Sequence, residues 1–505
     1  MQNLKKIRKI LGINWPVILM VLLALILRLY RLPSYMTFLG DEGRDALVWW
    51  RMLHRGKLTL IGPQTSIGNM YLGPLFYYLM FPFFVVWGTA GPSIGTALFA
   101  GATTFLLWRV GREWFSDKAG LTAAFLYAIS PVAIELSRSA WNPNIMPFFA
   151  LLAIWGIWQF WQKKNYFWLW TEGIFLSFAI QSHYLGLLLF PTVAIFWLIE
   201  LVILIKSKKS LKSYWLATLG AIAIFIILSV LPLIWFDLRH NFINYHAFYK
   251  FFSERQTTVN FKIYKAFPNF WPLWRMLIER LLAGKDSRAG LWTSLALLAL
   301  TVGTIWSVFR QDFFRRLVFR KSLWLVLTWL AMGLVGMGLY KQHIYDHYFG
   351  FLFPAVFLLA AAIFDCLWHR WRAAALVFLL LLTFFSLKNC PLRYPPGNQM
   401  KKTAEIAQKI IEESGGKNFN LGLIAKQNYD AGYRYFLEKW GYPPLVIDAQ
   451  KISATMTNQL FVICEEQCNP LGHPQAEIAN FGWAKIEQEW DFPWGAKLYK
   501  LVHSK

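Results

Sequence analysis

Long runs of apolar residues alternate along this chain with short polar stretches that hold many of its lysines and arginines. A helix needs about 20 apolar residues to cross a bilayer. Eleven runs of roughly this length precede residue 388, and we predict that each forms a membrane-spanning helix. The predicted spans are residues 10–27, 92–108, 119–134, 145–161, 167–180, 185–205, 214–235, 291–308, 323–339, 349–367 and 373–387.

A further apolar run at residues 71–87 is rich in Phe and Tyr but contains Gly73, Pro74 and Pro82. The basic residues at positions 5–9 place the amino terminus in the cytoplasm, because segments rich in Lys and Arg stay inside. If residues 71–87 do not cross the membrane, every later basic cluster also falls inside. We therefore predict that this run forms aromatic helices in or dipping into the outer interface.

Three longer segments face outward on this topology, and the last is long enough for a small domain. It shows a mixed α/β pattern, with a helix expected at 401–413 and strands at 421–425, 444–447 and 459–464. The predicted fold class is a polytopic α-helical membrane protein with about 11 transmembrane helices and a small extracytoplasmic α/β domain. The predicted divisions are a membrane domain at 1–388, with external loops at 28–91 and 236–290, and a carboxy-terminal domain at 389–505.

The composition agrees with a membrane protein, since 57% of residues are hydrophobic and only 15% are charged. Soluble domains carry about 25% charged residues, so a single soluble globule is excluded, as is a disordered chain. The net charge is +24, but most of the chain is too apolar to form the basic surface of a nucleic-acid binder. On the predicted topology, the outer side of the membrane domain holds 18 basic and 9 acidic residues. This excess opposes the positive-inside tendency and predicts a surface suited to a lipid phosphate.

Cysteine is sparse, and Cys464 and Cys468 both fall in the predicted extracytoplasmic domain. They could form a local disulfide, because disulfides persist outside the cytoplasm, or remain free thiols. Zinc is less favoured, because a single CxxxC motif lacks a second pair of ligands.

The loop after the first apolar run carries three carboxylates and an arginine: Asp41, Glu42, Arg44 and Asp45. The residues that follow have apolar side chains at helical spacing: Ala46, Leu47, Trp50 and Leu53. A short amphipathic helix is therefore predicted to begin here. Asp41 is either the N-cap of this helix, with Glu42 favoured by the helix dipole, or a general base at the lipid–water boundary.

The order of these features resembles the first external loop of the GT-C glycosyltransferases, in particular the aminoarabinose-transferase and protein O-mannosyltransferase-like superfamily. The motifs that carry the resemblance are Asp41-Glu42-Gly43-Arg44-Asp45-Ala46, Gly56-Lys57, Gly62-Pro63, Tyr71-Leu72-Gly73-Pro74-Leu75, Ser130-Pro131 before Arg138, Asn142-Pro143-Asn144, and Tyr348 leading into Pro354. The resemblance covers the eleven-span core. It implies a GT-C fold and transfer of a sugar from a polyprenyl-phosphate carrier to a hydroxyl of a lipid, glycan or protein, on the extracytoplasmic face of the plasma or inner membrane.

That reaction needs a base for the acceptor hydroxyl and cations for the departing lipid phosphate. Asp41 is the predicted base, Glu42 would orient the acceptor or hold Arg44, and a single displacement would invert the anomeric carbon. The candidate residues for the donor phosphate and substrate are Arg44, Arg138, Asn142, His183, Arg239, His240, Tyr345 and His347. Each also has a structural interpretation, as a group at the lipid headgroups, an interface histidine or a solvated surface residue.

No cofactor is expected with certainty. Aminoarabinose transferases often have Lys before the Pro-Pro of the aromatic run and tend to have Asp where this chain has Asn142 and Asn144. These departures weaken the case for a divalent metal, although His343 and His347 have the i, i+4 spacing that could hold one on a helix.

Two other function classes stay open. A transporter or lipid flippase would carry ionisable groups near the bilayer midplane, whereas the predicted spans hold few, of which Glu172 is the clearest. A non-catalytic scaffold would instead use its external domain to bind a partner.

Overall fold

The computed structural model describes residues 15–65, 70–253, 259–260, 262–310 and 317–504. The basic residues at positions 5–9, and the start of the first predicted span, lie outside this range. The chain divides into two compact units. The membrane unit comprises Met1–Tyr30, Thr59–Val86 and Gly91–Pro395, and the sheet unit comprises Arg31–Leu58, Trp87–Ala90 and Pro396–Lys505.

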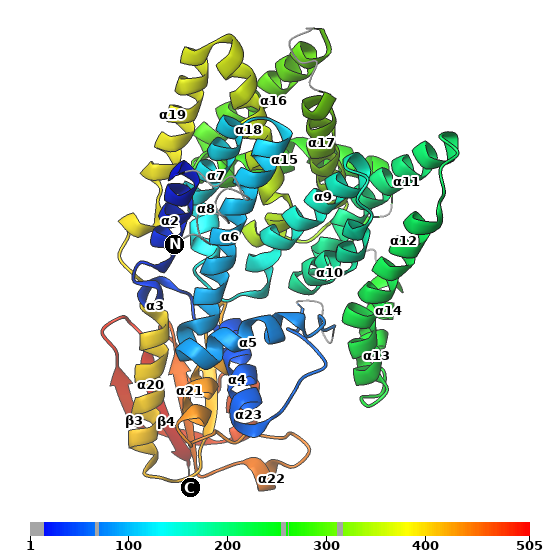
Figure 1. The fold of residues 1–505 in the computed structure, drawn as a ribbon. Coiled ribbons are helices and arrows are strands. Elements are labelled where there is room, and N and C mark those ends of the chain that lie inside the picture. Colours follow the sequence, from blue (N-terminus) through cyan, green and yellow to red (C-terminus); the bar gives the residue numbers. More distant parts are fainter. Residues whose placement is uncertain (1–14, 66–69, 254–258, 261, 311–316, 505) are drawn as a thin grey trace, which may run out of the picture. The chain divides into compact units, whose positions relative to one another are not determined.

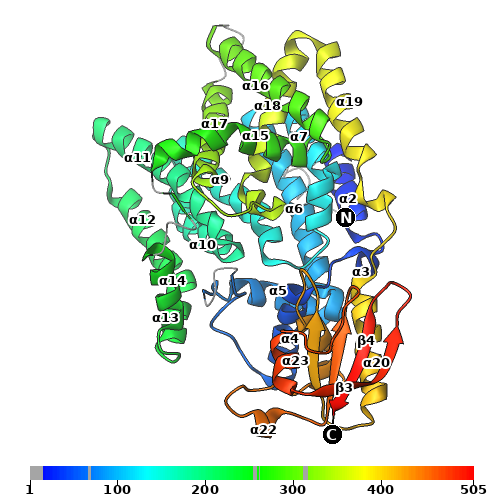
Figure 2. The same cartoon turned by 180° about the vertical axis from the view of Figure 1, so that it is seen from behind.

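The membrane unit is built from helices, drawn from blue to yellow in Figure 1 and from behind in Figure 2. Its α-helices are α2 (Trp15–Leu29), α5 (Leu75–Trp87), α6 (Gly91–Trp114), α7 (Asp117–Ile129), α8 (Pro131–Leu136), α9 (Met146–Gln162), α10 (Phe167–Ser182), α11 (Phe190–Lys206), α12 (Lys212–Phe225), α13 (Leu231–Asp237), α14 (Ile243–Ser253), α15 (Phe267–Leu281), α16 (Ser287–Arg310), α17 (Leu317–Gly338), α18 (Phe353–Arg370) and α19 (Arg372–Lys388). Short helical turns join them: η2 (Asn142–Ile145), η3 (Tyr184–Leu189), η4 (Ile226–Val230), η5 (Ile263–Ala266), η7 (Asp346–Leu352) and η8 (Pro391–Arg393).

Every one of the eleven predicted spans overlaps a helix, but only seven helical stretches in the described residues are long and apolar enough to cross a membrane. The helices α7, α10 and α19 have 13, 16 and 17 residues. At 1.5 Å per residue they fall short of a hydrocarbon core about 30 Å thick. The prediction of membrane helices is confirmed. The count differs because these three helices are short and because α2 is described only from Trp15.

The run at residues 71–87 forms one helix, α5, which has 13 residues and contains Pro82. It is joined to α6 through the turn η1 (Gly88–Ala90), so that Leu75–Trp114 is a nearly continuous helical stretch. By itself α5 is about 20 Å long, too short to span a bilayer. Its location in the interface stays a prediction.

The core of the membrane unit lies around α18, whose residues Phe353–Leu367 are all buried. A helix that is apolar on every side is typical of such a central position. Small residues bring other helices close together, as they commonly do in membranes. At the α6–α7 crossing, a Cβ atom added to Gly111 would lie 2.8 Å from Cα of Gly120.

The sheet unit holds a four-stranded sheet in the order β1-β2-β4-β3. The strands are β1 (Asn420–Ile424), β2 (Gln459–Cys464), β3 (Ala484–Asp491) and β4 (Lys497–His503), with β1 and β2 parallel and the other pairs antiparallel. Its helices are α3 (Leu32–Tyr35), α4 (Gly40–Arg55), α20 (Gln399–Ser414), α21 (Ala431–Lys439), α22 (Ile452–Thr455) and α23 (Ala476–Phe481). Figure 1 shows α21 between α4 and α20, in agreement with the contacts that α21 makes with both.

The α/β character of this unit is confirmed. The predicted helix at 401–413 is α20, and the strands predicted at 421–425 and 459–464 are β1 and β2. The strand predicted at 444–447 is wrong, because Leu445 forms only an isolated bridge with Asn420. The sequence pattern also missed β3 and β4, of which β3 is mostly exposed and polar and so lacks the apolar alternation of a half-buried strand. Cys464 and Cys468 form a disulfide.

Candidate active site

The carboxylates of the first loop lie inside a helix. The predicted helix began near Ala46, whereas α4 begins at Gly40 with Leu39 as N-cap, so Asp41 is not the N-cap. The capping interaction belongs to Glu42, which accepts the backbone N–H of Leu39 at 3.2 Å and the hydroxyl of Thr37. Burial raises the pKa of Glu42, although these hydrogen bonds oppose the rise. Glu42 therefore shapes the helix start, while the neighbouring Asp41 is left for other contacts.

The helix α4 packs along α21 of the same unit. Its buried apolar residues are Ala46, Leu47, Trp49 and Met52, so the predicted face with Trp50 and Leu53 is wrong in part, and Leu53 is 44% exposed. The buried face of α4 differs from the predicted one because the backbones of α4 and α21 approach closely. A Cβ atom on Gly43 would lie 2.3 Å from the backbone of Gly432. The predicted division placed residues 28–91 with the membrane domain, whereas Arg31–Leu58 falls in the sheet unit because α4 buries its face there.

Charge pairs fix the other end of α4 on α21. Arg51 donates two hydrogen bonds to the carboxylate of Glu438, at 2.9 and 2.6 Å, and Arg55 lies 2.9 Å from the same group. Burial alone would raise the pKa of Glu438, but the hydrogen bond and charge of Arg51, with the charge of Arg55, hold it below its usual value. The helix is therefore held at both ends, which fixes the direction in which its first turn points.

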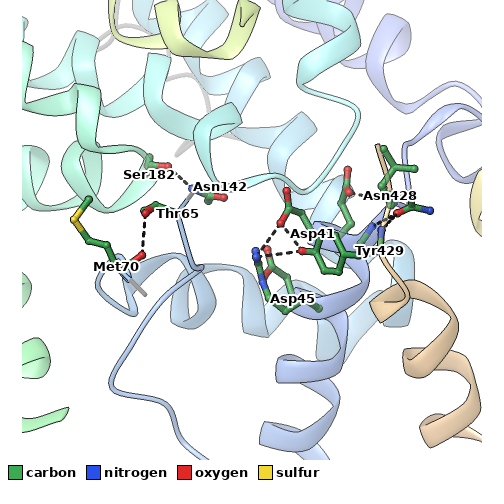
Figure 3. A network of polar contacts seen from close by, with 12 residues as sticks. Asp41, Asp45, Thr65, Met70, Asn142, Ser182, Asn428 and Tyr429 are labelled. Atoms are coloured by element: carbon green, nitrogen blue, oxygen red, sulfur yellow. Dashed lines mark hydrogen bonds and ion pairs between the residues drawn. The ribbon is translucent and has the colours of Figure 1, made fainter. Parts of the chain in front are cut away.

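Asp41 sits in this first turn and is held by two donors (Figure 3). The hydroxyl of Tyr429 donates to Oδ1 of Asp41 at 2.5 Å, and Nη1 of Arg44 donates to the same oxygen at 2.8 Å. Arg44 also contacts the fully buried Asp45 through Nε at 2.9 Å and Nη2 at 2.8 Å. The guanidinium thus bridges two carboxylates.

Tyr429 was not predicted as a site residue, and it comes from the carboxy-terminal part of the chain. The adjacent Asn428 accepts the N–H of Gly40 at 2.7 Å and donates to Glu465 at 2.6 Å. Tyr433 donates to the same Glu465 oxygen at 2.9 Å. Burial raises the pKa of Tyr429, so its hydroxyl keeps the proton that it donates to Asp41. No short motif surrounds this tyrosine, so the sequence carried no signal for it.

A second polar group lies in the membrane unit, where histidine and aromatic rings meet. The ring of His347 is 4.1 Å from that of Trp141 and 6.0 Å from that of His183. Tyr345 stacks against His347 with centroids 5.7 Å apart, and Tyr348 lies 4.6 Å from both histidine rings. Three predicted site residues therefore come together from two segments: His183 from one, and Tyr345 and His347 from the other. We call these five side chains the histidine–tyrosine cluster.

The hydrogen bonds of His183 define its chemical state. Its Nδ1 accepts the N–H of Leu185 at 3.2 Å, which leaves Nε2 as the N–H donor of a neutral ring. Burial lowers the pKa of His183 to about 4, so the ring is neutral at physiological pH. Nδ2 of Asn142 donates a hydrogen bond to the carbonyl oxygen of Ser182, the residue before His183, at 2.5 Å (Figure 3). Asn142 is therefore held against the segment that carries His183.

The predicted cations are placed differently. Arg138 is 2% exposed and donates to the carbonyls of Leu27 and Tyr30, at 2.7 and 2.6 Å, near the end of α2. Arg239 is exposed over the ring of Trp235, and His240 is exposed and stacked on Phe236 at 4.0 Å. The described hydrogen bonds of Arg138 thus go to backbone carbonyl groups. The ring contacts of Arg239 and His240 are with Trp235 and Phe236, which are not part of the histidine–tyrosine cluster.

One buried arginine escaped the sequence prediction. Arg28 is fully buried and donates to Ser137 and to the carbonyls of Ala24, Ala128 and Tyr127. A charge in this position is tolerated because its hydrogen bonds are satisfied. Its position at the end of a predicted span gave no hint of these partners.

The described residues contain no group of three His, Cys, Asp or Glu side chains that could hold a metal ion. The candidate pair does not share a helix face, because His343 is exposed and precedes η7, whereas His347 is buried within it. The ring of His343 instead lies 4.6 Å from that of Tyr345.

Comparisons with known proteins support the predicted resemblance to the GT-C glycosyltransferases in the fold and in part of the sequence. Residues 72–235 match the family model of dolichyl-phosphate-mannose-protein mannosyltransferase, a stretch that includes neither Asp41 nor the sheet. The fold is similar to that of ArnT from Cupriavidus metallidurans bound to undecaprenyl phosphate, with a TM-score of 0.63, 11% identity, and coverage of 96% of this chain and 97% of ArnT.

The fold is also similar to that of the Archaeoglobus fulgidus oligosaccharyltransferase in complex with Zn and sulfate. The TM-score is 0.51 at 12% identity, and the match covers 89% of this chain and 67% of the oligosaccharyltransferase. No curated protein sequence matches this chain. The predicted resemblance is therefore confirmed in the fold and in the family model, and none of these matches supports a transporter.

Proposed function

We propose that this protein transfers a sugar from a polyprenyl-phosphate donor to an acceptor hydroxyl, with Asp41 as the general base. One observation carries this assignment. Oδ1 of Asp41 is held by two donors, whereas Oδ2 has no partner among the described residues, and the side chain is 35% exposed. A fixed carboxylate with one open oxygen is suited to accept the proton of an incoming hydroxyl.

The donor class is supported by the known proteins. The matching family is described by dolichyl-phosphate-mannose, and the ArnT structure contains undecaprenyl phosphate. Both are polyprenyl phosphates. A lipid-linked donor also suits a transferase whose described residues include seven helical stretches that could span a membrane.

The membrane unit supplies candidate contacts for this donor. The neutral His183 offers an Nε2–H donor and Tyr345, 51% exposed, offers a hydroxyl; both can donate to phosphate or sugar oxygens. The exposed Arg239 and His240 are the predicted residues that can add positive charge. Arg44 and Arg138 already hold carboxylates and carbonyls, so we assign them positioning roles rather than phosphate binding.

The reaction follows from these assignments. The acceptor O–H bond breaks as its proton passes to Oδ2 of Asp41, and the acceptor oxygen forms a bond to the anomeric carbon. The bond from that carbon to the lipid phosphate oxygen breaks, and its electron pair stays on the phosphate. A single displacement of this kind inverts the anomeric configuration.

The proposed location is the plasma or inner membrane, with the sheet unit on the extracytoplasmic side. Single cysteines at exposed positions test this orientation in a variant that lacks the native cysteines. A membrane-impermeant maleimide should label a cysteine at Gln450 in intact cells, and one at Ser210 only after permeabilisation. Labelling of position 210 alone in intact cells would reverse the topology.

The function itself is tested with purified protein and a panel of polyprenyl-phosphate sugars, each with lipid, glycan and peptide acceptors. Mass spectrometry should detect a new glycosidic product with at least one pair, and NMR should show an inverted anomeric carbon. Release of polyprenyl phosphate without a product, or movement of the lipid across vesicles without a new bond, would contradict the proposal. The Asp41→Asn variant is the inactive control.

A further inference from the structure

We propose that Tyr429 is a positioning residue for Asp41. This inference rests on the proposed function, in which Asp41 is the general base. Its hydroxyl holds Oδ1 of the carboxylate so that Oδ2 is the oxygen that takes the acceptor proton. The sheet unit thereby contributes to catalysis from its own carboxy-terminal part. Tyr429 acts through Asp41 and needs no contact with the substrate.

The contacts of Asp41 are asymmetric. Tyr429 and Arg44 both donate to Oδ1, and their own donor atoms are 3.3 Å apart, so the two donors approach that oxygen together. Two hydrogen bonds on one oxygen fix the torsion of the carboxylate. A general base must lie within hydrogen-bond reach of the proton that it removes, and a fixed torsion keeps Oδ2 in one place.

Tyr429 is itself fixed in position. A Cβ atom added to Gly40 would lie 2.4 Å from its ring, so the ring rests directly against the first residue of α4. The neighbouring Asn428 connects the N–H of Gly40 to Glu465, and Tyr433 also donates to Glu465. The hydroxyl of Tyr429 is therefore placed relative to the same turn of α4 that carries Asp41.

The kinetic consequence is measurable. A residue that only positions the base makes no contact with the donor, so its loss should slow the chemical step without weakening donor binding. The expected signature is a fall in kcat with little change in KM for the donor.

The experiment compares Tyr429→Phe with Tyr435→Phe in the full-length protein with its best donor. Tyr429→Phe should lower kcat about tenfold to a hundredfold and change KM for the donor less than threefold. Tyr435 lies on α21 and its hydroxyl contacts Thr89 at 2.7 Å, so Tyr435→Phe loses a comparable hydrogen bond away from Asp41. This control should leave kcat unchanged.

Other outcomes overturn the inference. A loss of kcat in Tyr429→Phe with an equally large rise in KM for the donor would mean that the tyrosine is only structural. If Tyr429→Phe does not fold, Asn428→Ala decides, because it removes the support of Tyr429 and should lower kcat with the same small change in KM. An unchanged kcat in that variant would also sink the idea.

The proposed function can fail separately. Full turnover in Asp41→Asn would remove Asp41 as the base and the proposed function with it. An inactive Asp41→Asn beside a fully active Tyr429→Phe would overturn only the role of Tyr429.

Discussion

The side chains around Asp41 are joined by ion pairs, whereas the side chains of the histidine–tyrosine cluster are joined by contacts between uncharged rings. Arg44 bridges Asp41 and Asp45, and every one of these side chains is charged in its ordinary state. In the cluster, burial keeps His183 neutral, and its neighbours are Tyr348, His347 and Trp141. The first region is suited to proton transfer, and the second to contact with a sugar or phosphate through hydrogen bonds.

The cations near the cluster show the same contrast. Arg280 lies 3.3 Å from Asp346, and Lys285 lies 2.6 Å from Glu135 and 3.5 Å from Asp346. Their charge is already balanced within the membrane unit. Exposed residues such as Arg239 are therefore the cations that remain to attract a phosphate.

The largest effect is expected from removing the charge at Asp41. Asp41→Asn should lower kcat by about 10²–10⁴ fold, because an amide cannot accept the proton. Turnover of each purified variant measures this, with circular dichroism to check folding. Asp430→Asn is the matched control, since Asp430 pairs with Arg434 at 2.5 Å in the same unit. If both variants lose activity equally, charge in this unit matters only for folding.

The next effect comes from separating α4 from α21. Gly43→Ala places a Cβ atom 2.3 Å from the backbone of Gly432, so the helices must move apart. Overpacking of this kind costs about 1–3 kcal/mol, and turnover should fall as Asp41 loses its position. Thermal unfolding and turnover measure both effects. Gly397→Ala is the control, because its added Cβ would meet nothing within 4 Å. Equal stability of the two variants would contradict the close packing.

A smaller effect should appear when the cluster is titrated. The pKa of His183 is about 4 in the folded protein and about 6.5 when unfolded. Between these two pH values His183 is protonated in the unfolded chain but not in the folded one. The free energy of unfolding should therefore fall as the pH drops from about 6.5 to 4. His183→Gln should weaken this dependence, measured by unfolding at several pH values. His54→Gln, at an exposed position, should preserve it. The opposite ranking would mean that His183 is charged when folded.

The smallest effect is expected at Glu42, next to the proposed base. Glu42→Gln keeps an oxygen for the N–H of Leu39 and removes a buried charge, so kcat should stay within about threefold. The raised pKa of Glu42 means that it destabilises the fold as the pH rises above about 4.5, so the variant should be no less stable at pH 7. Turnover and thermal unfolding test this. A loss as large as that in Asp41→Asn would make Glu42 catalytic.

The local pattern of the sequence predicted much of the fold. Apolar runs of the right length located the membrane helices, and helical spacing located α20 and the end of α4. The buried face of α4 could not be predicted, because it is set by the contact of Gly43 with Gly432 rather than by hydrophobicity. A glycine leaves no apolar signal in a sequence.

The candidate site was predicted in parts. Asp41 stands out by its charge beside a membrane span, and the candidates His183, Tyr345 and His347 do meet. Tyr429 could not be found, because it is 388 residues from Asp41 and has no motif. Arg138 was assigned to phosphate because a sequence cannot show that its hydrogen bonds go to Leu27 and Tyr30.

The pairing of α4 with α21 has a consequence for biosynthesis. A ribosome makes α4 early and reaches α21 only near the end of the chain, and at about 5–20 residues per second the interval is on the order of tens of seconds. During that time α4 cannot form the contacts that it makes with α21 in the folded protein. A chain stopped before residue 431 would keep its proposed base but leave the helix that carries it unsupported. The helix that carries the proposed base therefore gains its packing partner only after residue 439 has been made.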